Sequence, residues 1–301
     1  MNDIIKFGSI SPVLVGKHGG RKNSDKILAS LKRSKLLTKK IEKFAPDLVI
    51  SFCSPEASRV AYGLNIPHIA FSDSPHAKAV MKLSLPFVTK LLTPWIIPKN
   101  DFTKFGINSK NIIRYRSIDA ALIIKNYKKN KIKKPKSKKT ILIRPEEIEA
   151  AYVSKKNNTV KIIKKIVRDF PDEEKIVLSR YKNQSKEMKK IFGSQILLFS
   201  KPINGEEILK HVDCFVGSGG TMTAEAGLLG IPTISLNSVP NRIENYLVKK
   251  RLIVRASTPE KVSREISDAL TSVNIRKNQA EKIISTFEDP YQILLKTIKM
   301  L

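Results

Sequence analysis

Cysteine, histidine and long apolar runs are scarce in this sequence. Two cysteines and four histidines occur among 301 residues, and none stands in a CxxC pair or at helical metal-ligand spacing. The sequence therefore predicts neither a resident metal nor disulfide bonds. No uninterrupted apolar run reaches the ~18 residues that span a bilayer, and the chain does not begin with a basic-then-apolar signal pattern. We expect a cytoplasmic protein.

Acidic residues are also few, because 27 Asp and Glu stand against 56 Lys and Arg, a formal net charge of +29. Such a surface attracts anions, which include nucleic acid, an anionic membrane face and phosphorylated substrates. The lysines are spread over nearly every predicted helix, and no helix-turn-helix, RNA-recognition or zinc-finger pattern occurs. No specific nucleic-acid partner is therefore expected. A lysine-rich codon usage of the source explains the excess equally well.

One glycine-rich stretch, residues 213–236 (DCFVGSGGTMTAEAGLLGIPTISL), organises the chain. It predicts a strand, a turn, a helix and a second buried strand, in that order, over residues 214–217, 218–220, 222–229 and 231–236. The adjacent Gly219 and Gly220 let the backbone approach a bound group, and the N–H groups of the first helical turn then face an anion. This is a candidate diphosphate site, and Glu225 suits the hydroxyls of a ribose. The alternative is a plain βα turn with Glu225 in solvent.

Strands and helices alternate along the rest of the chain, which predicts parallel sheets covered by helices and about two domains. The other predicted strands span residues 12–15, 47–52, 66–71, 112–115, 140–143, 175–178, 196–199 and 252–255. The apolar stretch 77–95 is interpreted as a core helix and strand, or alternatively as a face for an anionic membrane. Residues 125–139 are charge-dense and predict a linker.

Ligands of doubly wound sheets bind outside the carboxyl ends of the strands. Asp73, His76 and His18 follow predicted strands there and are candidates for acid/base catalysis, because an imidazole near a carboxylate titrates near neutrality. The alternative is that Asp73 caps the next helix and His76 packs at its start. Arg144 ends another strand and is a candidate for bidentate pairing with a phosphate. Arg180 is a second candidate, with a surface salt bridge as its alternative.

Several motifs resemble known families. GKHGG, SPEASRVAYGLNIPHIAF, HAKAVMKLSLP and VGSGGTMTAEAGLLGIP resemble domain of unknown function 354, an uncharacterised archaeal and bacterial family, over most of the chain. SGGTMTAEAGLLGIP is also similar to the nucleotide-sugar signature of GT-B glycosyltransferases, especially the UDP-N-acetylglucosamine transferase of peptidoglycan synthesis, and of non-hydrolysing UDP-N-acetylglucosamine 2-epimerases.

The resemblance implies a GT-B-like α/β fold of two Rossmann-like doubly wound domains that face one another across a cleft. Residues 1–124 would form the acceptor-side domain, 125–139 the basic linker, 140–289 the nucleotide-sugar-binding domain, and 290–301 a helix that returns to the first domain. Relatives begin with further βα units before their counterpart of GKHGG. The first domain is therefore expected to be truncated at its N-terminus.

The resemblance also implies a UDP-sugar as donor substrate, with no other cofactor. The implied nucleotide-sugar-binding residues are Arg144, Arg180, Ile203, Ser218, Gly219, Gly220, Thr221, Glu225, Asn241 and Asn245. By position the glycines lie near the diphosphate, Glu225 holds the ribose, Ile203 contacts the base, and Asn241 and Asn245 contact the sugar. The epimerases carry a His-Arg-x-Glu-Asn motif in which Ile143 and Glu147 here replace the histidine and the asparagine. This departure speaks against epimerase chemistry.

The main hypothesis is a metal-independent glycosyltransferase that uses a nucleotide-sugar donor. A helix N-terminus and arginines would stabilise the negative charge of the diphosphate leaving group. A lipid-linked or phosphorylated acceptor and peripheral association with the inner membrane face are accompanying expectations. The alternatives are an epimerase, and a non-catalytic basic module that binds RNA or anionic lipid through residues 125–139.

Overall fold

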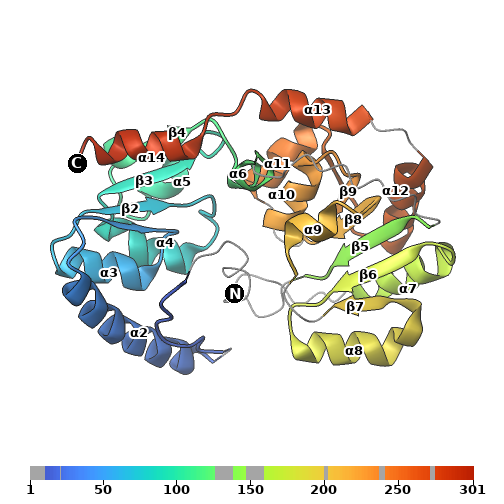
Figure 1. Ribbon diagram of the computed structural model, residues 1–301, viewed down its shortest axis with the longest axis horizontal. Coiled ribbons are helices and arrows are strands. Elements are labelled where there is room, and N and C mark those ends of the chain that lie inside the picture. The colour runs from blue at the N-terminus through green and yellow to red at the C-terminus, as the bar shows by residue number, and fades with distance from the viewer. Residues whose placement is uncertain are drawn as a thin grey trace. The chain divides into compact units, whose positions relative to one another are not determined.

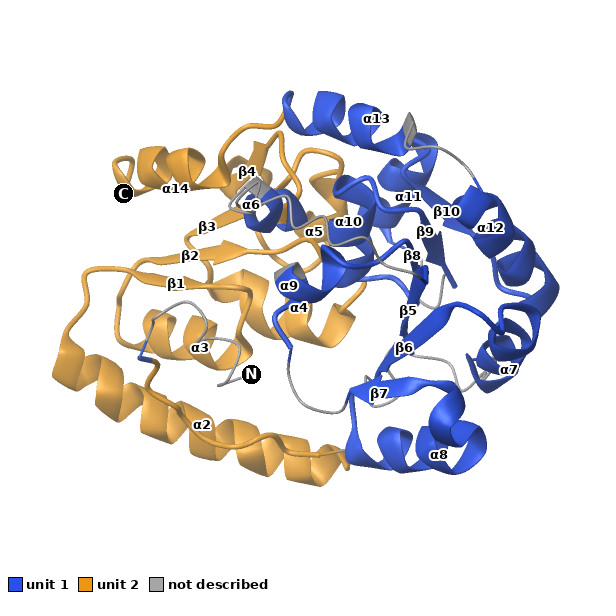
Figure 2. Ribbon diagram, turned by 45° about the vertical axis from the view of Figure 1, so that its right-hand side comes forward, with its two compact units in different colours: residues 1–11, 120–286 blue, residues 12–119, 287–301 orange. Residues whose placement is uncertain are grey.

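The structure, a computed structural model, describes residues 11–20, 22–125, 138–146, 159–199, 203–236, 241–271 and 275–301 (Figure 1). The chain divides into two compact units, which Figure 2 colours separately. Among the described residues, the N-terminal unit comprises 12–119 and 287–301, and the C-terminal unit comprises Ser11 and 120–286. No helix in these described ranges is long and apolar enough to cross a membrane.

The N-terminal unit is built on a four-stranded parallel sheet in the order β1-β2-β3-β4. Its strands are β1 (Val49–Ser51), β2 (His68–Phe71), β3 (Lys90–Pro94) and β4 (Ile112–Tyr115). Its helices and 3₁₀ turns are α2 (Asn23–Phe44), α3 (Pro55–Gly63), α4 (Lys78–Ser84), η1 (Leu85–Phe87), α5 (Asn100–Thr103), η2 (Ser109–Asn111) and α14 (Pro290–Ile298). Because strands adjacent in sequence are adjacent in the sheet, right-handed crossovers place the connecting helices on one face.

The opposite face of this sheet is covered by α14. Ile69, Phe71 and Leu92 point to a cluster that includes Ile293 and Leu294. Just before α14, the backbone N–H of Glu288 donates to the carbonyl of Arg116 at 2.9 Å, and the rings of Phe287 and Trp95 lie 5.6 Å apart. The C-terminal segment therefore completes the core of the N-terminal unit.

The C-terminal unit contains a six-stranded parallel sheet in the order β10-β9-β8-β5-β6-β7. Its strands are β5 (Thr140–Arg144), β6 (Glu174–Leu178), β7 (Leu197–Phe199), β8 (Cys214–Gly217), β9 (Thr233–Ser235) and β10 (Ile253–Arg255). Its helices and 3₁₀ turn are α6 (Asp119–Lys125), α7 (Thr159–Asp169), α8 (Lys182–Phe192), η3 (Gly193–Gln195), α9 (Gly205–Leu209), α10 (Thr221–Leu228), α11 (Arg242–Lys249), α12 (Pro259–Thr271) and α13 (Ile275–Ile284). Read from β7, this is the strand order of a dinucleotide-binding sheet, with its reversal between β5 and β8.

The predicted α/β class with two doubly wound sheets is confirmed, but one local prediction is wrong. Residues 12–15 form no strand. The stretch 77–95 consists of α4, η1 and β3, with Met81, Leu85 and Leu91 in the core, as its interpretation as a core helix and strand predicts. Most of the predicted linker, residues 126–137, lies outside the described residues.

Candidate functional site

The candidate site lies where the strand order of the C-terminal unit reverses, between β5 and β8. Open α/β sheets bind ligands at such a point, outside the carboxyl ends of the strands. The register of β5 and β8 places Arg144 beside Gly217. Gly217 in turn pairs with Ser235 of β9, which pairs with Arg255 of β10. One row of residues thus crosses four strands at this edge of the sheet. Arg255 was missed in the sequence, although it ends a predicted strand as Arg144 does.

The turn from β8 to α10 needs its glycines for two different reasons. Gly219 and Gly220 have φ angles of 97° and 89°, which L side chains rarely adopt. A Cβ on Gly217 would instead lie 2.4 Å from the Phe215 ring and 2.7 Å from the Thr223 hydroxyl oxygen. Gly220 is the N-cap residue of α10, and no side chain caps the helix. The turn therefore presents backbone to any anion at the start of α10.

Ser218 and Thr221 flank the glycines of this turn. Ser218 is buried, whereas Thr221 is exposed at the first position of α10. Thr221 can therefore reach a ligand at the helix N-terminus, whereas Ser218 is buried within the turn.

Glu225 lies on α10 and is only 7% exposed. Within the described part of the chain its carboxylate has neither a hydrogen bond nor an ion pair, and burial raises its pKa. Its Oε2 atom lies 3.6 Å from where a Cβ on Gly205 would stand, at the start of α9. The alternative that Glu225 is a solvated helix residue is therefore wrong. A buried carboxylate without a partner is costly unless a ligand supplies hydrogen bonds.

Ile203 lies in the same neighbourhood. It precedes α9 and packs with Met222 of α10 against the core of the sheet, while the Met222 Cε atom lies 3.3 Å from the same Cβ position of Gly205. The structure thus brings together the glycine turn, Glu225 and the residue predicted to contact the base.

The two predicted phosphate arginines lie at the adjacent carboxyl ends of β5 and β6. Nη1 of Arg144 donates to the Leu178 carbonyl at 3.0 Å, and Nε of Arg180 donates to the Pro145 carbonyl at 3.3 Å. These contacts hold both guanidinium groups at the edge of the sheet where β5 meets β6.

The two predicted sugar-binding amides have local partners. Asn241 caps α11, since its side-chain oxygen accepts from the Glu244 N–H at 2.8 Å. The Asn245 side-chain oxygen accepts from Arg255, whose Nε lies 2.8 Å from the carboxylate of the buried Glu244. The structure thus joins Asn245 to the arginine of β10. Contact of either amide with a sugar stays a prediction.

The N-terminal unit carries a cluster of titratable groups beyond its strand ends. Asp73 accepts from the Ser74 hydroxyl at 2.6 Å, and the Tyr115 hydroxyl donates to Asp119. Burial, and then the charge of Asp73, raise the pKa of Asp119 to about 6. Burial lowers the pKa of His76, while the negative charge of Asp73 opposes that shift. Asp73, His76 and Asp119 therefore share one electrostatic environment.

This cluster corrects one interpretation and adds one residue. The N-cap of α4 is Ala77, without a side-chain hydrogen bond, so Asp73 does not cap that helix. Asp119 was missed in the sequence, although it follows β4 as Asp73 follows β2.

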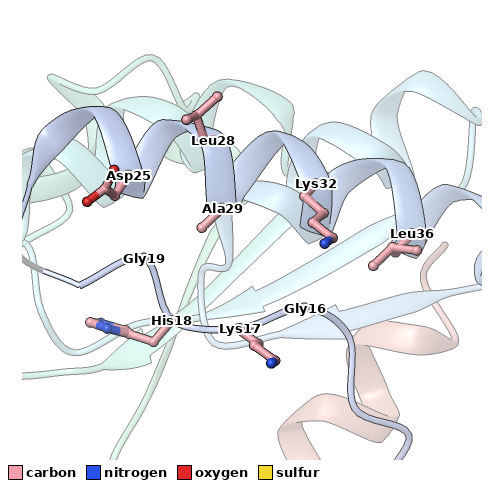
Figure 3. Close-up of a pocket in the computed structure, with 9 residues that line it drawn as sticks. All are labelled: Gly16, Lys17, His18, Gly19, Asp25, Leu28, Ala29, Lys32 and Leu36. Atoms are coloured by element: carbon pink, nitrogen blue, oxygen red, sulfur yellow. The ribbon is translucent and has the colours of Figure 1, made fainter.

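His18 lies apart from this cluster. Its ring is exposed, its Nδ1 accepts from the Gly20 N–H at 3.1 Å, and none of its described contacts reaches Asp73 or His76. It lines an open groove of about 550 Å³ between residues 16–19 and α2. Figure 3 shows Lys32 and Leu36 of α2 pointing toward this loop.

Arg33 fixes the loop beside that groove. It donates to the carbonyl of Lys17 at 3.0 Å and forms an ion pair with the buried Glu56 of α3. The loop is therefore tied to the helices rather than to the carboxyl ends of the strands. Across the described ranges, no three His, Cys, Asp or Glu side chains gather as metal ligands.

Comparison with solved structures identifies the fold. The fold is similar to that of UDP-GlcNAc 2-epimerase from Neisseria meningitidis bound to UDP-GlcNAc, at 16% identity and a TM-score of 0.62, over 88% of this chain and 82% of that one. It is similar also to the spinosyn forosaminyltransferase SpnP, at 13% identity and a TM-score of 0.61, over 99% of this chain and 88% of that one. The predicted GT-B-like fold is confirmed; at these identities the likeness concerns the fold alone.

The chain belongs to the family described as protein of unknown function (DUF354), whose model matches residues 2–300. This confirms the family prediction. The uncharacterized protein MJ0665 of Methanocaldococcus jannaschii is 27% identical over 297 residues, which cover 94% of this chain and 82% of that protein.

Proposed function

We propose that this protein is a metal-independent glycosyltransferase and that its C-terminal unit binds the nucleoside diphosphate of a UDP-sugar. The observation that carries the proposal is the buried side chain of Glu225, which lies one turn behind the N-terminus of α10 and forms no hydrogen bond or ion pair with another described residue. A diphosphate at the glycine turn would place ribose hydroxyls near this carboxylate. Similar folds that bind UDP-GlcNAc support the choice of nucleotide.

The proposed roles follow from position. Gly219 and Gly220 let backbone N–H groups approach the diphosphate, and Arg144 and Arg180 neutralise charge on it as the bond to the sugar breaks. The acceptor hydroxyl attacks the anomeric carbon and loses its proton to Asp73 or His76. We include a lipid-linked or phosphorylated acceptor in the proposal, since a surface with a net charge of +29 attracts anions.

An epimerase is the second candidate because of the similar fold. One observation argues against it: the position of the histidine in the epimerase motif is occupied by Ile143, which is fully buried in the core of the sheet. The chain therefore has no imidazole at that point.

Two measurements test the proposal. Isothermal titration should detect binding of UDP and UDP-N-acetylglucosamine, with weaker binding of UMP because it lacks the second phosphate. Failure of both UDP ligands to bind at millimolar concentration would reject the nucleotide site. Incubation of UDP-N-acetylglucosamine without an acceptor, followed by NMR, then distinguishes the candidates, because only an epimerase forms the 2-epimer. RNA or lipid binding that is lost on deletion of residues 125–139, without UDP binding, would favour the basic module.

A further inference from the structure

The outer side of α2 carries large apolar side chains that are more than half exposed, of which Leu28 also lines the groove beside residues 16–19. The helix has 22 residues and none is buried. Ile27, Leu28 and Leu31 are 61%, 64% and 54% exposed. They share one face because they stand three and four positions apart. Apolar side chains that are contiguous on a surface helix are typical of an interaction site, whereas single exposed ones are not.

The orientation of α2 is fixed by its inner side. Arg33 pairs with Glu56 of α3, and the half-buried Leu37 and Ile41 lie on the same side of the helix as Arg33. Figures 1 and 2 both show α2 as an outer layer against α3. The face with Ile27 and Leu31 therefore points away from the unit.

Basic residues extend this apolar face toward the C-terminus of the helix. Lys35 stands four positions after Leu31, and Lys39 four positions after Lys35, and both are exposed. The helix has seven basic residues and two acidic ones, namely Lys26, Lys32, Arg33, Lys35, Lys39, Lys40 and Lys43 against Asp25 and Glu42. A helix with this combination fits the boundary between anionic headgroups and acyl chains.

We infer that the outer face of α2 docks on an anionic lipid surface, with Ile27, Leu28 and Leu31 among the acyl chains and Lys35 and Lys39 at headgroup phosphates. A second copy of the chain is a poorer occupant, because two chains of net charge +29 repel one another. Nucleic acid is also a poorer occupant, because its phosphates would pair with the lysines but would not bury the apolar side chains. The inference goes beyond the proposed function, since it concerns another unit and holds whether or not UDP binds.

The test is flotation of the full-length protein with vesicles that contain phosphatidylglycerol and with vesicles of phosphatidylcholine alone. We expect binding to the former only, weakened by salt. The Ile27→Ser/Leu31→Ser variant should bind roughly tenfold or more weakly, and Lys35→Gln/Lys39→Gln roughly tenfold to thirtyfold more weakly. Because all four side chains are on the surface, both variants should keep the circular dichroism spectrum of the parent.

Matched controls lie elsewhere on the chain. Leu83→Ser removes another leucine that is 52% exposed, and Lys186→Gln/Lys189→Gln removes two exposed lysines from α8, whose Met188 and Phe192 are buried. These variants should float as the parent does, and the Ile27→Ser/Leu31→Ser variant should bind UDP as the parent does.

Three results would overturn the inference: no binding to anionic vesicles, binding that the control lysines weaken as much as Lys35 and Lys39 do, or a dimer in sedimentation that Ile27→Ser/Leu31→Ser dissociates while lipid binding persists. Loss of UDP binding alone would reject the proposed function and leave the lipid inference intact.

Discussion

Replacement of Glu225 by glutamine should change ligand binding and stability in opposite directions. The substitution keeps the size of the side chain and removes its charge at a position that is 7% exposed. If the carboxylate accepts hydrogen bonds from ribose hydroxyls, their loss costs about 1.5–3 kcal/mol, which weakens UDP binding roughly tenfold to a hundredfold. A variant of α8, Glu187→Gln, changes an exposed carboxylate of the same unit and serves as the matched control.

The free protein should become more stable. Burial raises the pKa of Glu225 above its ordinary value of 4.5, so this carboxyl group favours the folded state at low pH and loses that contribution as the pH rises above 4.5. The glutamine variant avoids the cost of burying a charged carboxylate. Each kcal/mol added to the free energy of unfolding raises Tm by about 2–4 °C for a unit of this size. The difference in Tm between variant and parent should therefore grow as the pH rises above 4.5.

A double-mutant cycle, in which one change is made in the protein and the other in the ligand, tests whether Glu225 contacts a ribose hydroxyl. Titration of parent and Glu225→Gln with UDP and with 2′-deoxy-UDP isolates the coupling between carboxylate and hydroxyl. Removal of either partner should weaken binding, and removal of both should weaken it little further. Equal affinity of parent and variant for UDP, or a lower Tm of the variant at pH 8, would refute the assignment of Glu225.

Three further predictions concern other parts of the chain. Gly220→Ala should weaken UDP binding and destabilise the protein by about 1 kcal/mol, because alanine is strained at a φ of 89° although the space around it is open; calorimetry checks both. Burial lowers the pKa of His68 from 6.5 to about 4, so up to about 3 kcal/mol of stability should be lost as the pH falls from 6.5 toward 4, and urea unfolding of His68→Gln should lack this slope. Asp73→Asn should lower the pKa of His76 further, because a negative charge is removed; an unchanged or higher value in an NMR titration would contradict the cluster.

Local signals in the sequence predicted much of the fold. Strand 214–217 and the following helix occur almost as expected, because a buried apolar run before paired glycines is compatible with few other local structures. Ser54 and Thr258 each accept a hydrogen bond from the first turn of the following helix, and these residue types are preferred at helix N-caps. Glu225 was found because its distance from the glycines fixes its depth in the helix.

Predictions that depended on distant neighbours were less successful. Residues 12–15 look like a strand in sequence, yet Val13 and Leu14 are exposed and pair with no other strand; a strand needs an edge to bind, and sequence does not reveal one. Likewise the apolar spacing of residues 27–31 predicts a buried face, but the spacing does not say what covers it. The local partners of Asn241 and Asn245, a helix end and Arg255, were not predicted either.

The titratable groups of the N-terminal unit are suited to taking a proton from a substrate rather than to taking one proton and returning another. Because burial lowers the pKa of His76, its imidazole is neutral at pH 7 and can accept a proton from an acceptor hydroxyl. Asp119, with a pKa of about 6, is mostly ionised at the same pH, and the Tyr115 hydroxyl that donates to it has a raised pKa and keeps its proton. An epimerase must remove a proton and return one, which requires an acid as well as a base. A cluster in which His76 and Asp119 are in the basic form suits a transferase, since transfer only takes the proton of the acceptor.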